Sequence, residues 1–147
     1  MPEPRVVHAE DALNWAEAGL GADPALFQIR ILRGALGCSE LGMSVVRIAP
    51  GVKVTTGHRH PGGEEVYVVV AGRVEAKVDD AIVVLEPLSA LRVPGEAVRA
   101  LRCVGTEEAV LVVASHPQDV PADTELVPGF WPAEPGETGV EVRLQLE

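Results

Sequence analysis

Short apolar runs separated by turn residues constrain the fold of this chain more than any other feature of its sequence. From residue 26 onward, apolar or alternating runs are interrupted at intervals of about 8 to 12 residues by turn pairs such as Pro-Gly and Asp-Asp. Valine, whose β-branched side chain suits pleated strands, is the commonest residue. The predicted strands are 26–33, 43–49, 52–57, 65–70, 73–78, 81–85, 89–93, 97–104 and 108–115. This spacing leaves no room for crossover helices and predicts an all-β sandwich or barrel.

The two ends of the chain depart from this pattern. Residues 9–19 predict a short helix that Asp11 caps and Gly19 ends. Residues 116–139 contain five prolines, which exclude a regular ladder or helix and predict an extended strap. The alternation of residues 140–147 predicts one more strand with one apolar face. This strand is expected to dock on the barrel's own edge or on the edge of a neighbouring subunit.

Two aromatic residues in the strap, Phe130 and Trp131, are expected to anchor it to a groove on the barrel or on a second subunit. We therefore divide the chain into an amino-terminal extension that packs on the barrel (1–35), a barrel (36–116), and a proline-rich strap and strand (117–147). The edge strands of a small barrel, together with the strap and the tail, predict a homodimer.

The charge balance excludes several classes of partner. Lys and Arg total 12 against 22 Asp and Glu, so the net charge of -10 repels nucleic acid and anionic membrane surfaces. No apolar run approaches the roughly 18 residues needed to cross a bilayer. The amino-terminal stretch lacks the apolar core of a secretory signal, so we expect a cytoplasmic protein. The charge balance predicts a partner that is small or a cation, and Arg99 favours a small anionic molecule. Two cysteines are too few for a disulfide framework.

A cluster of three metal-ligating residue types carries the most chemical information. His58 and His60 lie two apart, so on a strand both imidazoles point to the same face. Glu65 follows a Pro-Gly-Gly turn and begins the next strand. Two His and one carboxylate suit Fe(II), Mn(II), Zn or Ni with open coordination positions. A hydrogen-bonded surface cluster is the alternative interpretation of the same residues.

This segment resembles the first motif of the cupin superfamily, in which Gly, His-x-His, Glu and Gly recur in order. The matching residues are His58, His60, Glu65 and Gly72. The motif's first glycine corresponds to Gly51, which is displaced by one residue. The resemblance covers roughly residues 44–115 and implies a double-stranded β-helix, or jelly-roll barrel, with its site inside.

The family's second motif is degenerate in this chain. When the motif is aligned on Pro94, Arg99 stands where the family has the histidine that supplies a fourth metal ligand. A guanidinium stays protonated at ordinary pH and cannot coordinate a metal. The resemblance therefore implies a divalent metal site at His58, His60 and Glu65 whose occupancy depends on where the Arg99 side chain lies.

Two arrangements of Arg99 remain open, and they predict opposite states of the pocket. In the first, His58, His60 and Glu65 hold a metal, while Arg99 pairs with a substrate carboxylate or with Glu64. In the second, Arg99 pairs with Glu65 and fills the space that a cation needs, because a dication and a fixed guanidinium repel each other strongly in a low-dielectric barrel. Tyr67 shares the face of Glu65 and is the second predicted substrate-binding residue.

Two functions follow from these arrangements. The first is a mononuclear metal enzyme of the oxygenase or isomerase type that acts on a small carboxylate-bearing substrate. The second is a metal-free cupin that binds or senses a small ligand without catalysis. A purely structural oligomerisation domain is the weakest alternative, because it leaves a costly buried polar cluster unexplained. No catalytic residue is assigned, since cupin-like barrels host many reactions on one scaffold.

Overall fold

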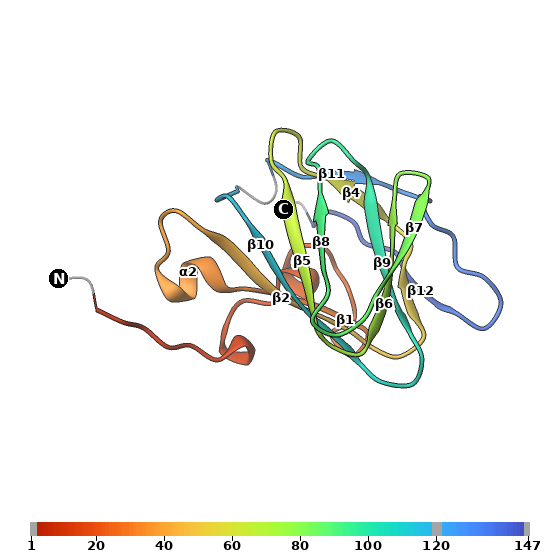
Figure 1. Ribbon diagram of the computed structural model, residues 1–147, viewed down its shortest axis with the longest axis horizontal. Coiled ribbons are helices and arrows are strands. Elements are labelled where there is room, and N and C mark those ends of the chain that lie inside the picture. Colours follow the sequence, from red (N-terminus) through yellow and green to blue (C-terminus); the bar gives the residue numbers. More distant parts are fainter. Residues whose placement is uncertain (1–2, 119–121, 146–147) are drawn as a thin grey trace.

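The computed structural model describes residues 3–118 and 122–145, which fold as a barrel of two β-sheets (Figure 1). One sheet has five strands in the order β1-β2-β10-β5-β8. The other contains the strands β11-β4-β9-β3-β12 in that order, and β6 also pairs with β9 and carries β7 on its other edge. The strands are β1 Phe27–Ile31, β2 Gly42–Ile48, β3 Val52–Val54, β4 Gly57–Arg59, β5 Glu65–Ala71, β6 Arg73–Val78, β7 Ala81–Leu85, β8 Ala90–Val93, β9 Arg99–Val104, β10 Ala109–Ser115, β11 Glu125–Val127 and β12 Thr138–Val140. The all-β jelly roll predicted from the sequence is confirmed.

Alternation along the central strands places the core between the two sheets. In β5, Tyr67 and Val69 are buried, whereas Val68 between them is only half-buried. The neighbouring β10 repeats this pattern in register, with Leu111 opposite Val69 and Val113 opposite Tyr67. Period-two burial of this kind follows from the strand pleat, and it directs one face of each strand into the barrel.

The amino-terminal region differs in detail from the prediction. A short helix is present, but the single helix expected over residues 9–19 is wrong in extent: a 3-10 turn, η1 (Ala9–Asp11), is followed by α1 (Trp15–Ala18). Asn14 separates them because its carbonyl oxygen Oδ1 accepts the Ile29 amide at 3.0 Å, which ties the chain to the edge of β1. Pairing with the sheet outweighs local helix propensity here.

A second helix, α2 (Leu32–Leu36), replaces the end of the strand predicted over residues 26–33. It ends at Gly37, whose φ of 74° lies in the left-handed region that favours glycine at a helix carboxyl end. In Figure 1, α2 lies outside the barrel, beside the end of β2. Strand β1 therefore ends at Ile31, and the chain continues directly into α2.

The strap and tail pack on the chain's own barrel. Trp131 is buried, its backbone amide donates to the Thr55 carbonyl at 3.0 Å, and the Lys53 ammonium lies 4.6 Å from the centre of its ring. The strand predicted over residues 140–147 is wrong in extent: β12 (Thr138–Val140) pairs in parallel with β3, whereas residues 141–145 form no strand, although Val142 is buried. The expectation that the prolines exclude a ladder from the strap is also wrong, because β11 lies within it and pairs with β4. Figure 1 shows the strap, in blue, running beside the second sheet. Of the two docking modes left open by the sequence, the tail takes the barrel's own edge; residues 146–147 lie outside the described part.

Docking of the tail also explains why the strand predicted over residues 52–57 is divided. The Thr55 amide donates to the Val140 carbonyl at 2.9 Å, and the Thr56 hydroxyl accepts the Val142 amide at 3.0 Å. These bonds draw residues 55 and 56 out of the ladder with β9, so the predicted strand is divided into β3 and β4. Across the two described ranges, no helix has the length and apolar character needed to span a bilayer.

Candidate functional site

Two imidazoles converge inside the barrel, as the His-x-His spacing predicts. His58 lies in β4 opposite Arg99 of β9, and His60 follows β4, where its backbone amide donates to the Gly95 carbonyl at 2.9 Å. The two ring centres are 5.0 Å apart, with an angle of 69° between the ring planes. The second ring is fixed from the strap, since His60 Nδ1 lies 3.1 Å from the Asp123 carbonyl oxygen.

Both imidazoles are held in the neutral form. Burial lowers the pKa of His58 well below its usual value, and the positive charge of Arg99 lowers that pKa further. Burial also lowers the pKa of His60, although the nearby Glu65 carboxylate opposes this effect. A neutral imidazole offers one donor and one acceptor nitrogen. Because His60 Nδ1 donates to the Asp123 carbonyl, Nε2 is the His60 nitrogen left to accept from a ligand near pH 7, beside the His58 ring.

Glu65 is the point at which the polar groups meet. It begins β5 and is only 7% exposed. Its Oε1 atom accepts hydrogen bonds from the Tyr67 hydroxyl and from Arg99 Nη2, each at 2.9 Å, and lies 3.5 Å from His60 Nε2. The inward direction of Glu65 and Tyr67 agrees with the strand alternation, and the ion pair with Arg99 is the second of the two arrangements that the sequence left open.

Arg99 is fully buried and held by four acceptors. Besides Glu65, its Nε donates to the Tyr67 hydroxyl at 3.2 Å, and Nη1 donates to the carbonyls of Ala97 at 2.8 Å and Gly95 at 3.3 Å. Burial disfavours its charge, but Tyr67 and Glu65 outweigh that effect and raise the pKa of Arg99. Because Arg99 is not among the residues lining the cavity, its expected role in binding substrate stays a prediction that this arrangement does not favour.

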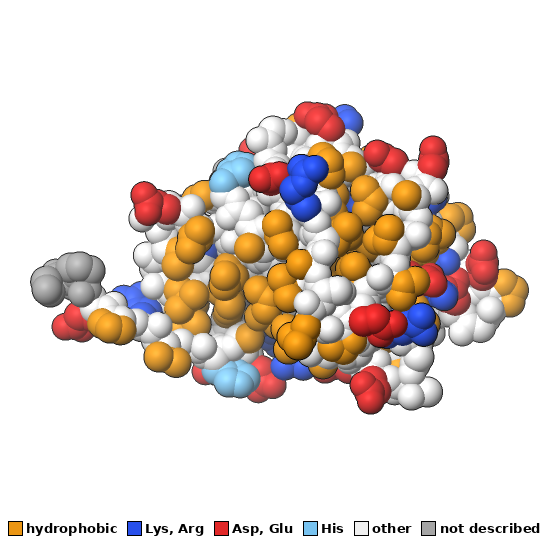
Figure 2. All heavy atoms as spheres, viewed as in Figure 1, with side chains coloured by type: hydrophobic (Ala, Val, Ile, Leu, Met, Phe, Trp, Pro, Cys, Tyr) orange, Lys and Arg blue, Asp and Glu red, His pale blue; other side chains and the backbone are white. Residues whose placement is uncertain are grey.

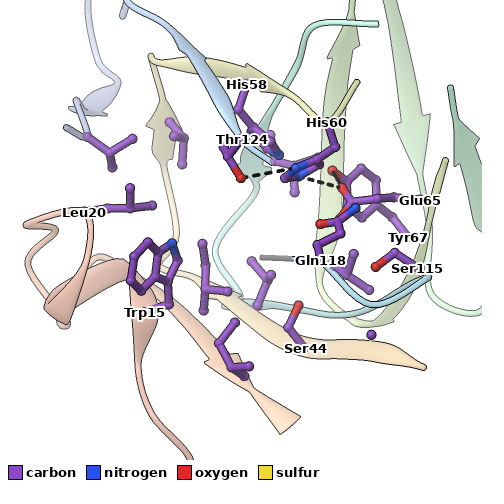
Figure 3. Close-up of a pocket in the computed structure, with 18 of the residues that line it drawn as sticks. Trp15, Leu20, Ser44, His58, His60, Glu65, Tyr67, Ser115, Gln118 and Thr124 are labelled. Carbon is purple, nitrogen blue, oxygen red and sulfur yellow. Dashed lines mark hydrogen bonds and ion pairs between the residues drawn. The ribbon is translucent and has the colours of Figure 1, made fainter. Parts of the chain in front are cut away.

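A cavity of about 150 Å³ opens beside this cluster (Figure 3). His58, His60, Glu65, Tyr67 and Thr124 form a polar wall, and Figure 3 shows Trp15 and Leu20 on the opposite side. A dry cavity of about this size holds a benzene-sized molecule. The remaining apolar lining includes Phe27, Ile29, Val46, Leu101, Val113 and Leu126.

Sequence reasoning missed the lining residues that come from outside the barrel strands. Trp15 and Leu20 belong to the amino-terminal extension, and Gln118 and Thr124 belong to the strap. The sequence indicated that both segments cover the barrel, but no local pattern predicts which of their side chains reach its interior. Thr124 is fixed by His60, because its hydroxyl lies 3.3 Å from His60 Nδ1.

The donor set fits a divalent metal only in part. The ligand atoms of His58, His60 and Glu65 all lie within 4.8 Å of one another, and two neutral imidazoles with a carboxylate suit such an ion. However, the carboxylate oxygen that faces His60 already accepts from a phenol and a buried guanidinium. A dication at this point would lie beside a fixed positive charge in a low-dielectric interior. With Arg99 placed as it is, the cluster does not fit a resident metal.

Comparison with solved structures supports the fold. A Klebsiella pneumoniae protein described as having a double-stranded β-helix domain is 17% identical, with a TM-score of 0.65 over 85% of this chain and 98% of the other. A putative sugar phosphate isomerase from Acidithiobacillus ferrooxidans is 19% identical, with a TM-score of 0.59 over 85% and 87% of the two chains. KdgF from Halomonas sp. is 18% identical, with a TM-score of 0.55 over 68% and 87%.

Sequence comparison identifies the family. A search of curated proteins found no significant match. The sequence profile of the family described as "Cupin domain" matches residues 44–115, the range over which the sequence resembles the superfamily. Those residues run from β2 to β10 and carry His58, His60, Glu65 and Arg99. The chain therefore belongs to the cupin superfamily, and residues 44–115 form its cupin domain.

Proposed function

We propose that this protein binds a small organic molecule inside the barrel without a resident metal ion. The observation that carries the proposal is the buried ion pair between Arg99 and Glu65 at the wall of a largely apolar cavity. The guanidinium neutralises the carboxylate that would otherwise attract a cation. This function corresponds to the metal-free binding or sensing cupin among the two expected from the sequence.

The chemistry of the wall supports hydrogen bonding to a ligand. Burial raises the pKa of Tyr67 far above its usual value, so the phenol stays protonated and donates to Glu65. The neutral imidazole of His58 and the acceptor nitrogen Nε2 of His60 add polar groups on the same side of the cavity. A ligand with an apolar body and one polar end matches this division of the cavity.

A mononuclear metal enzyme of the oxygenase or isomerase type, acting on a small carboxylate-bearing substrate, is the second candidate. It is supported by the approach of three ligand atoms to within 4.8 Å of one another and by the neutral state of both imidazoles. The fold likeness to a putative sugar phosphate isomerase is consistent with it. Fe, Mn, Zn or Ni would suit the donors. In this case Arg99 has to leave Glu65 before an ion binds.

Calorimetric titration with hexanoate and hexanamide tests the proposal. We expect at least one of these probes to bind with the same affinity before and after dialysis against EDTA. The variant Val113→Phe places a ring in the cavity from β10 and should abolish binding, whereas Ile82→Phe, at an exposed position of β7 that does not line the cavity, should not. Absence of binding by both probes, or binding that EDTA removes, would contradict the proposal. Thermal unfolding checks that both variants fold.

We also propose that the chain forms a homodimer, as the sequence predicts. Figure 2 shows hydrophobic side chains gathered on the face over β2, β10 and β5, where strand alternation directs side chains out of the barrel. Val45, Val112 and Val68 lie side by side across this face. A partly exposed apolar sheet face of this kind is typical of an interface, and a second copy is the occupant we propose. Sedimentation velocity of the intact chain tests this proposal. We expect a particle of twice the chain's mass, and a particle with the mass of one chain would contradict the homodimer.

A further inference from the structure

Two side chains that line the cavity have buried hydrogen-bond donors with no partner. Arg33 Nε and Gln118 Nε2 are both shielded from solvent, and within residues 3–118 and 122–145 neither has an acceptor. An unsatisfied buried donor lowers the stability of a folded protein, and most buried polar groups in folded proteins are paired. Two residues that line one cavity therefore have hydrogen-bond donors that a bound acceptor group would satisfy.

Both donors lie at the same end of the barrel as the polar wall. Ser44 pairs with Ile31 at the end of β1, and Ser115 at the end of β10 pairs with Glu65. Arg33 follows Ile31 by two residues and Gln118 follows Ser115 by three, so both segments leave the sheet at the mouth where Glu65 begins β5. Figure 3 shows Gln118 close to Glu65 and Ser115, on the side opposite Trp15 and Leu20.

The charges that face the cavity favour an anion at this end. Among the described lining residues, the formal charges belong to Arg33 and Glu65, since His58 and His60 are neutral. The negative charge of Glu65 is balanced by its ion pair with Arg99, which does not line the cavity. Arg33, by contrast, forms no ion pair in the described part of the chain. The cavity therefore carries one uncompensated positive charge, despite the net charge of -10 on the whole chain.

We infer that the cavity binds a small monocarboxylate with an apolar body, whose carboxylate accepts hydrogen bonds from Arg33 Nε and Gln118 Nε2. The inference rests on the proposed small-molecule function and names its ligand class and its anchoring residues. The sequence had assigned substrate-carboxylate binding to Arg99, but that guanidinium is fully buried and bonded to Glu65. Arg33 supplies the same chemistry from the amino-terminal extension, with a charge that a carboxylate neutralises.

The apolar side of the cavity determines which kind of ligand body binds best. Trp15, Leu20 and Phe27 line the side that would face the body of a bound molecule, and burial of each methylene there should raise affinity about fourfold. Affinity should therefore rise along the series acetate, butyrate and hexanoate until the cavity is full. A second oxygen-rich group at the far end would meet no polar partner and should weaken binding.

Calorimetric titration of paired probes tests the inference at physiological ionic strength. Hexanoate and benzoate carry the charge, and hexanamide and benzamide have the same bodies without it. We expect the wild-type protein to bind each carboxylate at least about tenfold more tightly than its amide, because a hydrogen bond to a charged group contributes about 1.5–3 kcal/mol. Arg33→Met should remove this preference, Arg33→Lys should keep part of it, and Gln118→Leu should reduce it.

Arg73→Met is the matched control, since it removes the same charge from an exposed site on β6 that pairs with Glu86. It should leave the preference unchanged. Equal binding of amides and carboxylates by the wild-type protein, or a preference that survives Arg33→Met, would overturn the inference but leave the small-molecule function standing. No binding by any of the four probes would overturn both. Thermal unfolding provides the folding check, and Arg33→Met should not lower stability, because it removes an unsatisfied buried donor.

Discussion

At the scale of single residues, the position of Arg99 decides the character of the site. Motif spacing was sufficient to place Arg99 opposite the two imidazoles and Glu65, because alternation and register follow from the backbone. It could not choose between pairing with Glu65 and pairing with a ligand, because both use the same strand position. The deciding contacts, the carbonyls of Gly95 and Ala97, belong to a turn whose path no sequence pattern fixes.

Removal of one partner from this pair should be costly. Arg99→Met leaves Glu65 as an uncompensated buried charge and should lower the free energy of unfolding by about 3–5 kcal/mol, measured by urea denaturation at pH 7. The double variant Glu65→Leu/Arg99→Met should recover most of this loss, because it replaces the ion pair with apolar groups. Arg92→Met breaks the exposed pair with Glu64 and should cost less than about 1 kcal/mol. If Arg99→Met lowered the free energy of unfolding no more than Arg92→Met does, Arg99 would not lie in a buried ion pair.

At the scale of elements, the strap and tail are part of the barrel wall. The proline pattern was sufficient to predict an extended segment, and Phe130 and Trp131 were identified as its anchors. Which side of the barrel they reach depends on ion pairs between distant residues. Glu137 of the strap pairs with Lys53 of β3 at 2.7 Å and with Arg102 of β9. Contacts between residues so far apart in sequence are not visible in local patterns.

The Glu137 cluster predicts how stability depends on pH. Burial alone would raise the pKa of Glu137, but hydrogen bonds from Lys53 and its other partners lower that pKa to about 2. A carboxylate with a lowered pKa in the folded state adds stability that is fully present above about pH 4.5 and is lost as pH falls toward 2. Glu137→Gln should therefore lower the free energy of unfolding at pH 7 and flatten its decline between pH 4.5 and 2.

Glu141→Gln provides the comparison for this prediction. Glu141 also lies in the tail, but its pair with Arg143 is long, at 3.5 Å, and both side chains are exposed. Its removal should change the pH profile little, because exposed pairs are strongly screened. Urea unfolding at a series of pH values measures both variants. Parallel acid profiles of the wild type and Glu137→Gln would refute the role given to this cluster.

At the scale of the whole molecule, the fold was predictable and the contents of the barrel were not. Turn pairs and alternation define an all-β barrel, and the His-x-His and Glu spacing places its site inside. The cavity, however, is completed by Trp15 and Leu20 from one end of the chain and by Gln118 and Thr124 from the other. The size and polarity of the cavity result from tertiary packing of the amino-terminal extension and the strap. The sequence predicted only that these two segments pack on the barrel.

The central claim, that the barrel functions without a resident metal, is tested most directly by the metal content of the purified protein. The wild type, His60→Ala and Arg99→His are purified without chelator or nickel resin and analysed by plasma mass spectrometry. We predict less than stoichiometric metal in the wild type, no further loss in His60→Ala, and a gain in Arg99→His, which adds a ligand and frees Glu65. Stoichiometric metal in the wild type that is lost in His60→Ala would contradict the claim.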